Sequence, residues 1–417
     1  MSEKKQWHLF EAIGVELEYM IVDRDSLDIR PIADELIKEV AGEYRNEVER
    51  GAISWSNELA LHVIELKTNG PADSLDGLDM KFQEQVNEIN RRLKPRNAML
   101  LPTAMHPWMD PDKEMKLWPH EYNPIYEAYN RIFDCRGHGW ANLQSTHINL
   151  PFVGDEEFEK LHAAIRVLLP ILPGIAASSP ISDAQITGFT DFRMEVYRSN
   201  SKRIPSVTGL IVPEAVFTEE DYNREIFQRM YRDIAPYDPD GILQDEWLNS
   251  RGAIARFDRG SIEIRVLDIQ ESPLADLALV RLVVDTLNAL VEERLGSLEA
   301  QKSWNEKKLY EILLNVIEEG EKAEIPIDFL QLFGISADTE MTVNRLWNYI
   351  FNEIYTTDYE TPDPMVRTAE RILKTGTLSS RIVKSFNGRT PGKGELMEVY
   401  RSLSGVLSEG KLFKDNE

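Results

Sequence analysis

The chain has 417 residues, of which 42% are hydrophobic and 28% are charged, a composition typical of a soluble globular protein with ample material for a core. Its 71 acidic residues outnumber 47 lysines and arginines and give a formal charge of -24 at pH 7. That charge repels a polyphosphate backbone and argues against nucleic acid as a partner. A smaller anionic ligand would need a divalent metal and a local group of arginines.

The single cysteine, Cys135, excludes an intrachain disulfide and a cysteine metal cage, which fits a reducing cytoplasm. The N-terminus meets Glu11, Glu16 and Glu18 before any apolar run of signal-peptide length. The most apolar later stretch, residues 161–181, is interrupted by one arginine and several prolines, so no membrane span is predicted.

Strands and helices are both predicted in the first 270 residues. Apolar residues at period two or in short runs predict strands, and apolar residues at helical spacing predict helices. The predicted strands are 10–23, 59–68, 98–104 and 142–151, with a hairpin over 251–268 that turns at 258–260; the predicted helices are 73–93 and 155–173. Beyond residue 273 nearly everything has helical period, with helices over 273–295, 302–321, 341–356 and 364–374.

Three of these strands share one design, with branched apolar residues on one face and ionisable or amide groups on the other. Glu16 and Glu18 lie two apart and project to the same side of their strand, and so do the pairs His147 with Asn149 and Glu263 with Arg265. Two like-charged carboxylates on one face are unfavourable unless a cation sits with them.

Magnesium suits such a set because it is a hard ion that prefers carboxylate and phosphate oxygens, and a neutral imidazole is tolerated at magnesium or manganese sites. Glu58 and Glu65 supply two more carboxylates. Their separation of seven places Glu58 in the loop before the strand and Glu65 within it.

Each element taken alone has a plainer interpretation. Glu16 and Glu18 could form a solvated acidic face of an edge strand, His147 could be a satisfied, partly buried histidine, and Glu263 with Arg265 could be an ordinary charge pair. Recurrence favours a site, because the same pattern occurs on three strands and Glu65 lies on a fourth.

The ordered segments GVELEYMIVD, ELALHVIELKT, STHINLP, ASSP and SIEIRVLDIQ resemble the glutamate-cysteine ligase type 2 family, also called the carboxylate-amine ligases. This family is similar to glutamine synthetase in its catalytic barrel. The resemblance covers roughly residues 10 to 290. It implies an α+β fold with a curved, mainly antiparallel sheet backed by helices, with a catalytic domain over 1–298 and a helical region over 299–417.

The resemblance also implies roles for the individual residues. Glu16 and Glu18 would belong to two different metal sites, and Glu58 and Glu65 would complete the metal near the amino-acid substrate. His147 and Glu263 would join Glu16 around the metal that bridges the nucleotide phosphates, and Arg265 would contact the phosphoryl group in transfer. Arg265 and Glu58 are the predicted catalytic residues.

Two segments depart from the family pattern. Asn149 stands where relatives often have a second histidine, and WLNSRGAIARF follows the Trp-Asp-x-Arg pattern only in part. Both departures bear on amino-acid specificity.

The chemistry agrees with the resemblance. A carboxylate accepts an amine only after activation, and transfer of the ATP γ-phosphoryl group makes an acyl phosphate that an amine can attack. Metals and arginines must neutralise the moving charge. The predicted cofactors are Mg²⁺ or Mn²⁺ with ATP as co-substrate, and the predicted nucleotide-binding residues are Arg193, Arg251, Arg256 and Arg265.

The predicted reaction joins the side-chain carboxylate of glutamate, or a related acid, to an amine such as that of cysteine. Two alternatives stay open: a guanidino-kinase-like phosphotransferase, and a non-catalytic metal or nucleotide sensor. The predicted partners are small molecules, with no nucleic acid and no membrane. A homo-oligomer is not decided by the sequence, and the predicted location is the cytoplasm.

Overall fold

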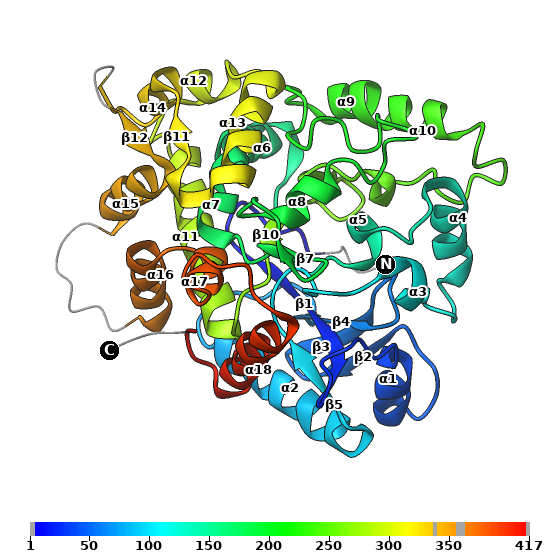
Figure 1. The fold of residues 1–417 in the computed structure, drawn as a ribbon. Helices are drawn as coiled ribbons and strands as arrows, with labels where there is room; N and C mark the ends of the chain where they lie inside the picture. The colour runs from blue at the N-terminus through cyan, green and yellow to red at the C-terminus, as the bar shows by residue number, and fades with distance from the viewer. Residues whose placement is uncertain (1–4, 337–339, 356–362, 414–417) are drawn as a thin grey trace.

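A mainly antiparallel sheet of eight strands runs through the middle of the molecule (Figure 1). The structure is a computed structural model that describes residues 5–336, 340–355 and 363–413. The strand order is β2-β3-β4-β1-β6-β10-β9, and β5 pairs with the far end of β1. The strands are β1 (Gly14–Asp23), β2 (Glu47–Arg50), β3 (Ile53–Asn57), β4 (Val63–Thr68), β5 (Ala98–Leu101), β6 (Ser145–Pro151), β9 (Ala253–Arg256) and β10 (Ser261–Asp268).

Strand β1 organises this sheet because it is long enough to pair with three others. Its residues 16–20 pair with β4 on one side. On the other side, residues 14–17 pair with β6 and residues 20–23 pair with β5. The side chains of Val15, Leu17, Tyr19 and Ile21 are fully buried, while Glu16 and Glu18 project from the opposite face.

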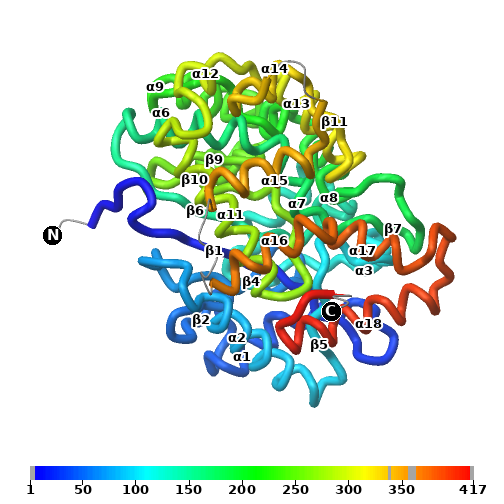
Figure 2. The backbone as a smooth tube through the Cα atoms, turned by 90° about the vertical axis from the view of Figure 1, so that its left-hand side faces the viewer, coloured from blue at the N-terminus to red at the C-terminus, as the bar shows by residue number. Residues whose placement is uncertain are grey.

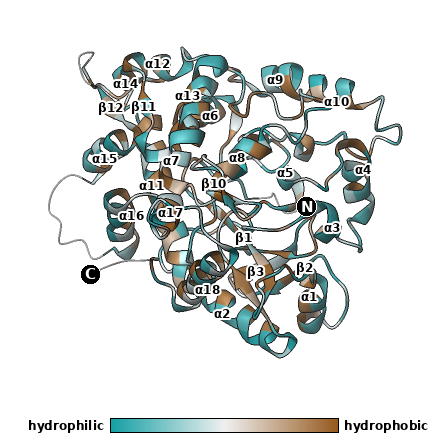
Figure 3. Cartoon of the chain, in the orientation of Figure 1, coloured by the Kyte–Doolittle hydropathy of each residue, from teal (hydrophilic) through white to brown (hydrophobic). Residues whose placement is uncertain are grey.

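Helices cover the apolar face of the sheet, where α11 packs against both α2 and α6, and all three share one core with β1. Figure 3 shows the hydrophobic colour on the central strands and the hydrophilic colour on outer helices such as α12 and α13. The first ten helices are α1 (Ala33–Ala41), α2 (Leu78–Leu93), α3 (Pro111–Glu114), α4 (Asn123–Phe133), α5 (His138–Ala141), α6 (Gly154–Leu168), α7 (Pro173–Ala176), α8 (Phe192–Tyr197), α9 (Glu219–Tyr222) and α10 (Gln228–Ile234).

The C-terminal part is helical, as predicted, apart from the short pair β11 (Glu324–Ile325) and β12 (Met341–Thr342). Figure 2 shows α16 running beside α11. The remaining helices are α11 (Pro273–Val291), α12 (Leu298–Lys302), α13 (Glu306–Glu319), α14 (Ile327–Leu332), α15 (Val343–Ile354), α16 (Pro364–Thr375), α17 (Leu378–Lys384) and α18 (Lys393–Glu409); a last short pair is β7 (Ile181–Ser182) with β8 (Gln185–Ile186). The division at residue 298 stays a prediction, and the hydrophobic core continues across it.

Several predicted boundaries shift for local reasons. Strand β5 ends at Leu101 rather than residue 104, because Pro102 has no N–H for the ladder and Thr103 has a φ of +86°. Helix α2 begins at Leu78 rather than residue 73, directly after Gly77 with a φ of +72°. The hairpin β2–β3 was not predicted. Among the described helices, none is long and apolar enough to cross a bilayer.

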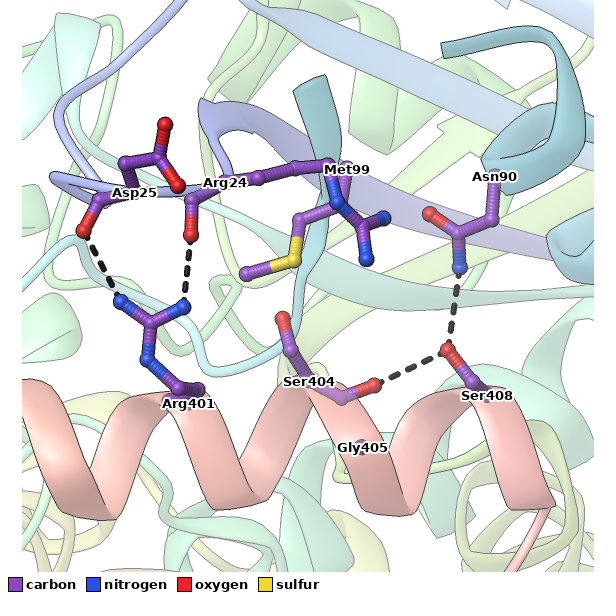
Figure 4. Close-up of a pocket in the computed structure, with 8 residues that line it drawn as sticks. All are labelled: Arg24, Asp25, Asn90, Met99, Arg401, Ser404, Gly405 and Ser408. Carbon is purple, nitrogen blue, oxygen red and sulfur yellow. Dashed lines mark hydrogen bonds between the residues drawn. The ribbon is translucent and has the colours of Figure 1, made fainter. Parts of the chain in front are cut away.

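Helix α18 docks against β5 and α2, close to the turn that follows β1. Figure 4 shows the Arg401 guanidinium reaching the carbonyl oxygens of Arg24 and Asp25, at 2.6 and 2.9 Å. The Ser404 hydroxyl donates to the Leu100 carbonyl at 2.7 Å. A groove of about 390 Å³ remains between α18 and the sheet. The last helix is thus tied to the backbone of β5 and of the turn after β1.

A buried ion pair also holds the C-terminal region. Arg381 Nη1 lies 2.5 Å from the Glu271 carboxylate, which is wholly buried, and also donates to the Phe413 carbonyl at 2.9 Å. Arg381→Met would leave Glu271 buried without a counter-ion. We expect a loss of about 3–5 kcal/mol in the free energy of unfolding, measured by urea denaturation.

The control for this prediction is Lys374→Met, which breaks an exposed pair with Glu370 and should cost less than about 1 kcal/mol. An equally small loss for Arg381→Met would show that the Glu271 pair does not stabilise the fold.

Candidate active site

Four adjacent strands place acidic side chains and one histidine on the polar face of the sheet, opposite the face covered by α2, α6 and α11. Glu16 on β1 faces His147 on β6, and Glu18 on β1 faces Glu65 on β4. Glu263 on β10 faces Asn149 on β6. We call the set Glu16, Glu18, Glu65, His147 and Glu263 the carboxylate–histidine cluster. Pairing register alone therefore brings together residues that lie up to 247 positions apart, Glu16 and Glu263.

His147 lies at the centre of the cluster. Its Nδ1 is 2.9 Å from Glu16 Oε2 and 3.8 Å from Glu263 Oε1, and its Nε2 is 3.8 Å from Glu18 Oε1. The Ser145 hydroxyl lies 2.9 Å from His147 Nε2. One imidazole therefore touches or approaches three carboxylates.

Neighbouring polar groups fix the orientation of the carboxylates. The Asn149 amide donates to Glu16 Oε1 at 3.0 Å. The Ser145 backbone N–H donates to Glu18 Oε2 at 2.6 Å, and the Ser56 hydroxyl donates to Glu65. Such surrounding hydrogen bonds position potential metal ligands before an ion arrives.

Two sets of ligand atoms within the cluster are close enough to hold one cation each. Glu16, His147 and Glu263 form one set, and Glu18, Glu65 and His147 form the other; within each set the ligand atoms lie within 4.8 Å of one another. Carboxylate oxygens with one imidazole suit Mg²⁺ or Mn²⁺. The donor set therefore fits the predicted ion, and His147 is shared between the two sets.

Electrostatics show that the cluster carries more negative charge than its surroundings balance. Burial alone would lower the pKa of His147, but its hydrogen bond to Glu16 and the nearby carboxylates raise it to about 9. Burial would raise the pKa of Glu16, but His147 lowers it to about 2. Burial and the charge of Glu16 raise the pKa of Glu65 well above its ordinary value. A divalent cation would supply the charge that protons supply here.

Glu58 lies in the loop between β3 and β4, as predicted, and Glu65 lies within β4. Burial, followed by the charge of Glu18, raises the pKa of Glu58 to about 8. The neighbouring Asn57 amide donates to the Tyr126 hydroxyl at 3.0 Å. Burial and Glu58 together raise the pKa of that tyrosine. Glu58 is thus electrostatically coupled to the cluster from outside the strands.

Arg265 is the predicted arginine that lies directly beside the cluster. Its Nε donates to Glu263 Oε1 at 3.1 Å, and a second guanidinium nitrogen, Nη2, also contacts this carboxylate. Burial alone would lower the pKa of Arg265, but Glu263 and the Tyr197 hydroxyl raise it well above its ordinary value. A permanent cation therefore stands next to one of the two ligand sets.

The other three predicted arginines hold different positions. Arg193 is buried, pairs with Asp268, and donates to the Arg265 carbonyl at 3.3 Å, so it supports the strand that carries Arg265. Arg256 is bound by Asp258 at 3.2 Å near the β9–β10 turn.

Arg251 is wholly buried and pairs with Glu214, with Nε 2.6 Å from Oε2 and Nη2 2.7 Å from Oε1. Its Nη1 binds the Ser206 carbonyl and the Asn249 side chain. All of these partners lie outside the cluster. The structure thus brings Arg265 to the cluster and surrounds Arg251 with structural partners.

A cleft of about 1340 Å³ opens where the strands end beside the cluster. It is lined by Glu16, by Lys67 and Asn149, by the turn at residues 257–261 and by residues 5–7. We call it the strand-end cleft. Glu16 lines this cleft and also belongs to the Glu16–His147–Glu263 set. A cation bound by that set would therefore face a small molecule bound in the cleft.

Sequence reasoning missed several residues around the cluster. Ser145 and Lys67 each lie two positions from a predicted ligand on the same strand, so period two could have found both. Tyr197 ends helix α8 and Tyr126 lies in α4, and neither position carries a sequence signal that points to the sheet.

A mainly antiparallel sheet with carboxylates on one face is the arrangement that the resemblance to the carboxylate–amine ligases implied. A sequence model described as glutamate-cysteine ligase family 2 matches residues 12–319, and the chain belongs to this family. A protein of Archaeoglobus fulgidus described as uncharacterized is 37% identical over 284 residues, covering 67% of this chain and 75% of that protein. A Nocardioides protein provisionally named glutamate–cysteine ligase 2-1 is 24% identical, covering 67% and 68%.

Solved structures share the fold at low sequence identity. The glutamate–cysteine ligase of Francisella tularensis, solved with AMP, superimposes with a TM-score of 0.63 at 14% identity, covering 98% of this chain and 91% of that one. A bifunctional glutathione synthetase from Pasteurella multocida gives 0.57 at 12% identity, covering 96% of this chain and 52% of that one. These likenesses confirm the predicted fold class.

The Arg251–Glu214 pair gives a test of whether Arg251 serves stability or ligand binding. Glu214→Gln would leave the buried guanidinium without its carboxylate, and we expect a loss of about 3–5 kcal/mol in the free energy of unfolding near neutral pH. ATP affinity, measured by equilibrium dialysis under folding conditions, should stay within about twofold, which is less than 0.5 kcal/mol. A large drop in ATP affinity in the folded variant would instead support nucleotide binding by Arg251.

The Arg251–Glu214 pair should also make the free energy of unfolding depend on pH. Burial would raise the pKa of Glu214, but Arg251 lowers it below its ordinary value. A carboxyl with a depressed pKa in the folded state contributes stability that is complete above its unfolded pKa and is lost as pH falls through the folded one. The stability difference between wild type and Glu214→Gln should therefore shrink below about pH 4.5. A difference that stays constant down to about pH 3 would contradict this role.

Proposed function

We propose that this chain is an ATP-dependent carboxylate–amine ligase that joins the side-chain carboxylate of glutamate to the amine of cysteine, through a γ-glutamyl phosphate. The observation that carries the proposal is the carboxylate–histidine cluster, whose member Glu16 lines the strand-end cleft. Family membership supports the ligase class.

The cluster would hold Mg²⁺ or Mn²⁺ in two sets, with Glu16, His147 and Glu263 facing the nucleotide, and Glu18 and Glu65, together with Glu58, facing the amino acid. When bound, the ions would neutralise phosphate and carboxylate oxygens and so lower the barrier to phosphoryl transfer. The strand-end cleft would take the nucleotide, because it opens directly onto Glu16.

Arg265 would stabilise the charge on the phosphoryl group in transfer. Two contacts with Glu263 orient its guanidinium. The Arg265 side chain is 24% exposed, so a phosphoryl group could reach it. Arg193 would act indirectly, since it binds the Arg265 carbonyl. The second step, attack of the amine on the acyl phosphate, releases inorganic phosphate and forms the amide.

The test of the reaction is release of ADP and phosphate with glutamate present and amines added one at a time, with the products identified by mass spectrometry. A ligase should release phosphate strongly only when both acid and amine are present, and cysteine should give γ-glutamylcysteine. Phosphorylation of an amine or guanidine without an amide product would favour the phosphotransferase. Binding of magnesium and ATP with no turnover for any pair would favour the sensor.

Substitution of a cluster carboxylate tests the site itself. Glu263→Gln should lower turnover by more than about 100-fold, because the loss of a group that merely orients a metal ligand already costs about 10- to 100-fold. The free energy of unfolding should fall by only about 1–2 kcal/mol, because the amide relieves repulsion among the carboxylates while Arg265, which loses its charged partner, is part-exposed to solvent.

The matched control for Glu263→Gln is Glu398→Gln, an exposed position on α18 with the same chemical change. This variant should keep wild-type turnover. Severe unfolding of Glu263→Gln with urea midpoints far below those of the control would point to a structural role for the cluster.

A further inference from the structure

Lys67 is a cation on the polar face of the sheet that the proposed reaction has not yet used. It follows Glu65 by two positions on β4, and its register partners are Glu16 on β1 and Ser54 on β3. Its Nζ lies 3.5 Å from Glu65 Oε2 and 2.8 Å from Glu47 Oε2. The ammonium therefore bridges a buried member of the cluster and a carboxylate at the sheet edge.

Lys67 also lines the strand-end cleft, together with Glu16 and Asn149. Its side chain is 28% exposed, while the side chain of Glu65 is 8% exposed and that of Glu47 is 43% exposed. A long side chain with its stem on the sheet and its ammonium at a cleft wall can change partners by rotating its terminal bonds. The cleft is where the proposed function places ATP.

Charge balance indicates when Lys67 would change partners. Lys67 is in contact with Glu65, which belongs to the Glu18–Glu65–His147 ligand set. A divalent ion at that set would take up the charge of Glu65 and repel the nearby ammonium. A phosphate group in the adjoining cleft would then be a stronger partner for Lys67 than the exposed Glu47, because charge-assisted bonds to phosphate are strong and exposed pairs are weak.

We propose that Lys67 is a nucleotide-binding residue that exchanges its ammonium from Glu65 to a phosphate of ATP when a divalent cation binds at Glu18 and Glu65. This inference rests on the proposed function, since it places ATP in the strand-end cleft. The exchange makes the metal and the nucleotide bind cooperatively: the metal releases Lys67, and the nucleotide keeps it away from the metal ligands.

The test measures the two affinities separately in Lys67→Met. Mn²⁺ binding without nucleotide, followed by the paramagnetic resonance of the free ion, should become about 3- to 10-fold tighter, because a competing positive charge has been removed. ATP binding at saturating Mn²⁺, measured by equilibrium dialysis, should become about 10- to 100-fold weaker, because a charge-assisted bond is lost. Lys67→Arg keeps the charge and should hold the ATP affinity within about threefold.

Glu47→Gln is the matched control, because it removes the other partner of Lys67 and leaves the lysine in place. It should weaken Mn²⁺ binding without nucleotide and leave ATP binding unchanged or tighter, the reverse of Lys67→Met. If Lys67→Met fails to fold, the separate variants Glu47→Gln and Lys67→Arg still test the exchange. Unchanged Mn²⁺ affinity in Glu47→Gln would overturn the proposal.

Other outcomes separate this inference from the proposed function. Metal and ATP affinities that fall together in folded Lys67→Met would show a purely structural lysine and overturn the exchange. Unchanged ATP affinity in Lys67→Met would also overturn the exchange. If the wild-type protein still joins acid and amine, the ligase proposal would stand. A wild-type protein that binds neither Mn²⁺ nor ATP would overturn both.

Discussion

The crowding of carboxylates on one face of an antiparallel sheet is the constraint on which the structure depends. Glu16, Glu18, Glu65 and Glu263 project into the same space, and like charges at such short range are tolerated only with compensating cations. His147 provides part of that compensation through its hydrogen bond to Glu16, and the flanking Lys67 and Arg265 provide more. The need for positive charge follows directly from the arrangement of the strands.

The sheet can hold this unfavourable set because its other face is a deep hydrophobic core. Residues Val15, Leu17, Tyr19 and Ile21 are wholly buried beneath helices, and burial of side chains of this size contributes about 1.5–3 kcal/mol each. Successive side chains of a strand point to opposite faces of the sheet. A shift of one residue in the pairing register would therefore turn Glu16 and Glu18 into that core. The hydrophobic face thus fixes the register that assembles the site.

The sequence predicted those features that depend on local periodicity. The strands of Glu16, His147 and Glu263 were found because apolar and ionisable residues alternate there, and the loop position of Glu58 followed from its distance to Glu65. The hairpin β2–β3 was missed because β3 is buried on both faces, with Ser54 and Ser56 on the polar face and Asn57 on the face of Trp55, which removes the usual contrast between faces. The partners of Arg251 and Arg193 come from distant segments, and a sequence shows a charge but not its partner.

The pairing of the site's cations explains how so acidic a protein can take an anionic substrate. Arg265 is bound to Glu263, Lys67 to Glu65 and Glu47, and His147 to Glu16, so these three positive groups are each held by carboxylates. With a formal charge of -24, the molecule as a whole repels a nucleotide. Divalent ions at the carboxylates would offset the local negative charge and leave Lys67 and Arg265 available to an anionic substrate, while His147 would serve as a neutral ligand. Metal binding would therefore prepare the cleft for the nucleotide, and the acidity of the face is what makes that switch effective.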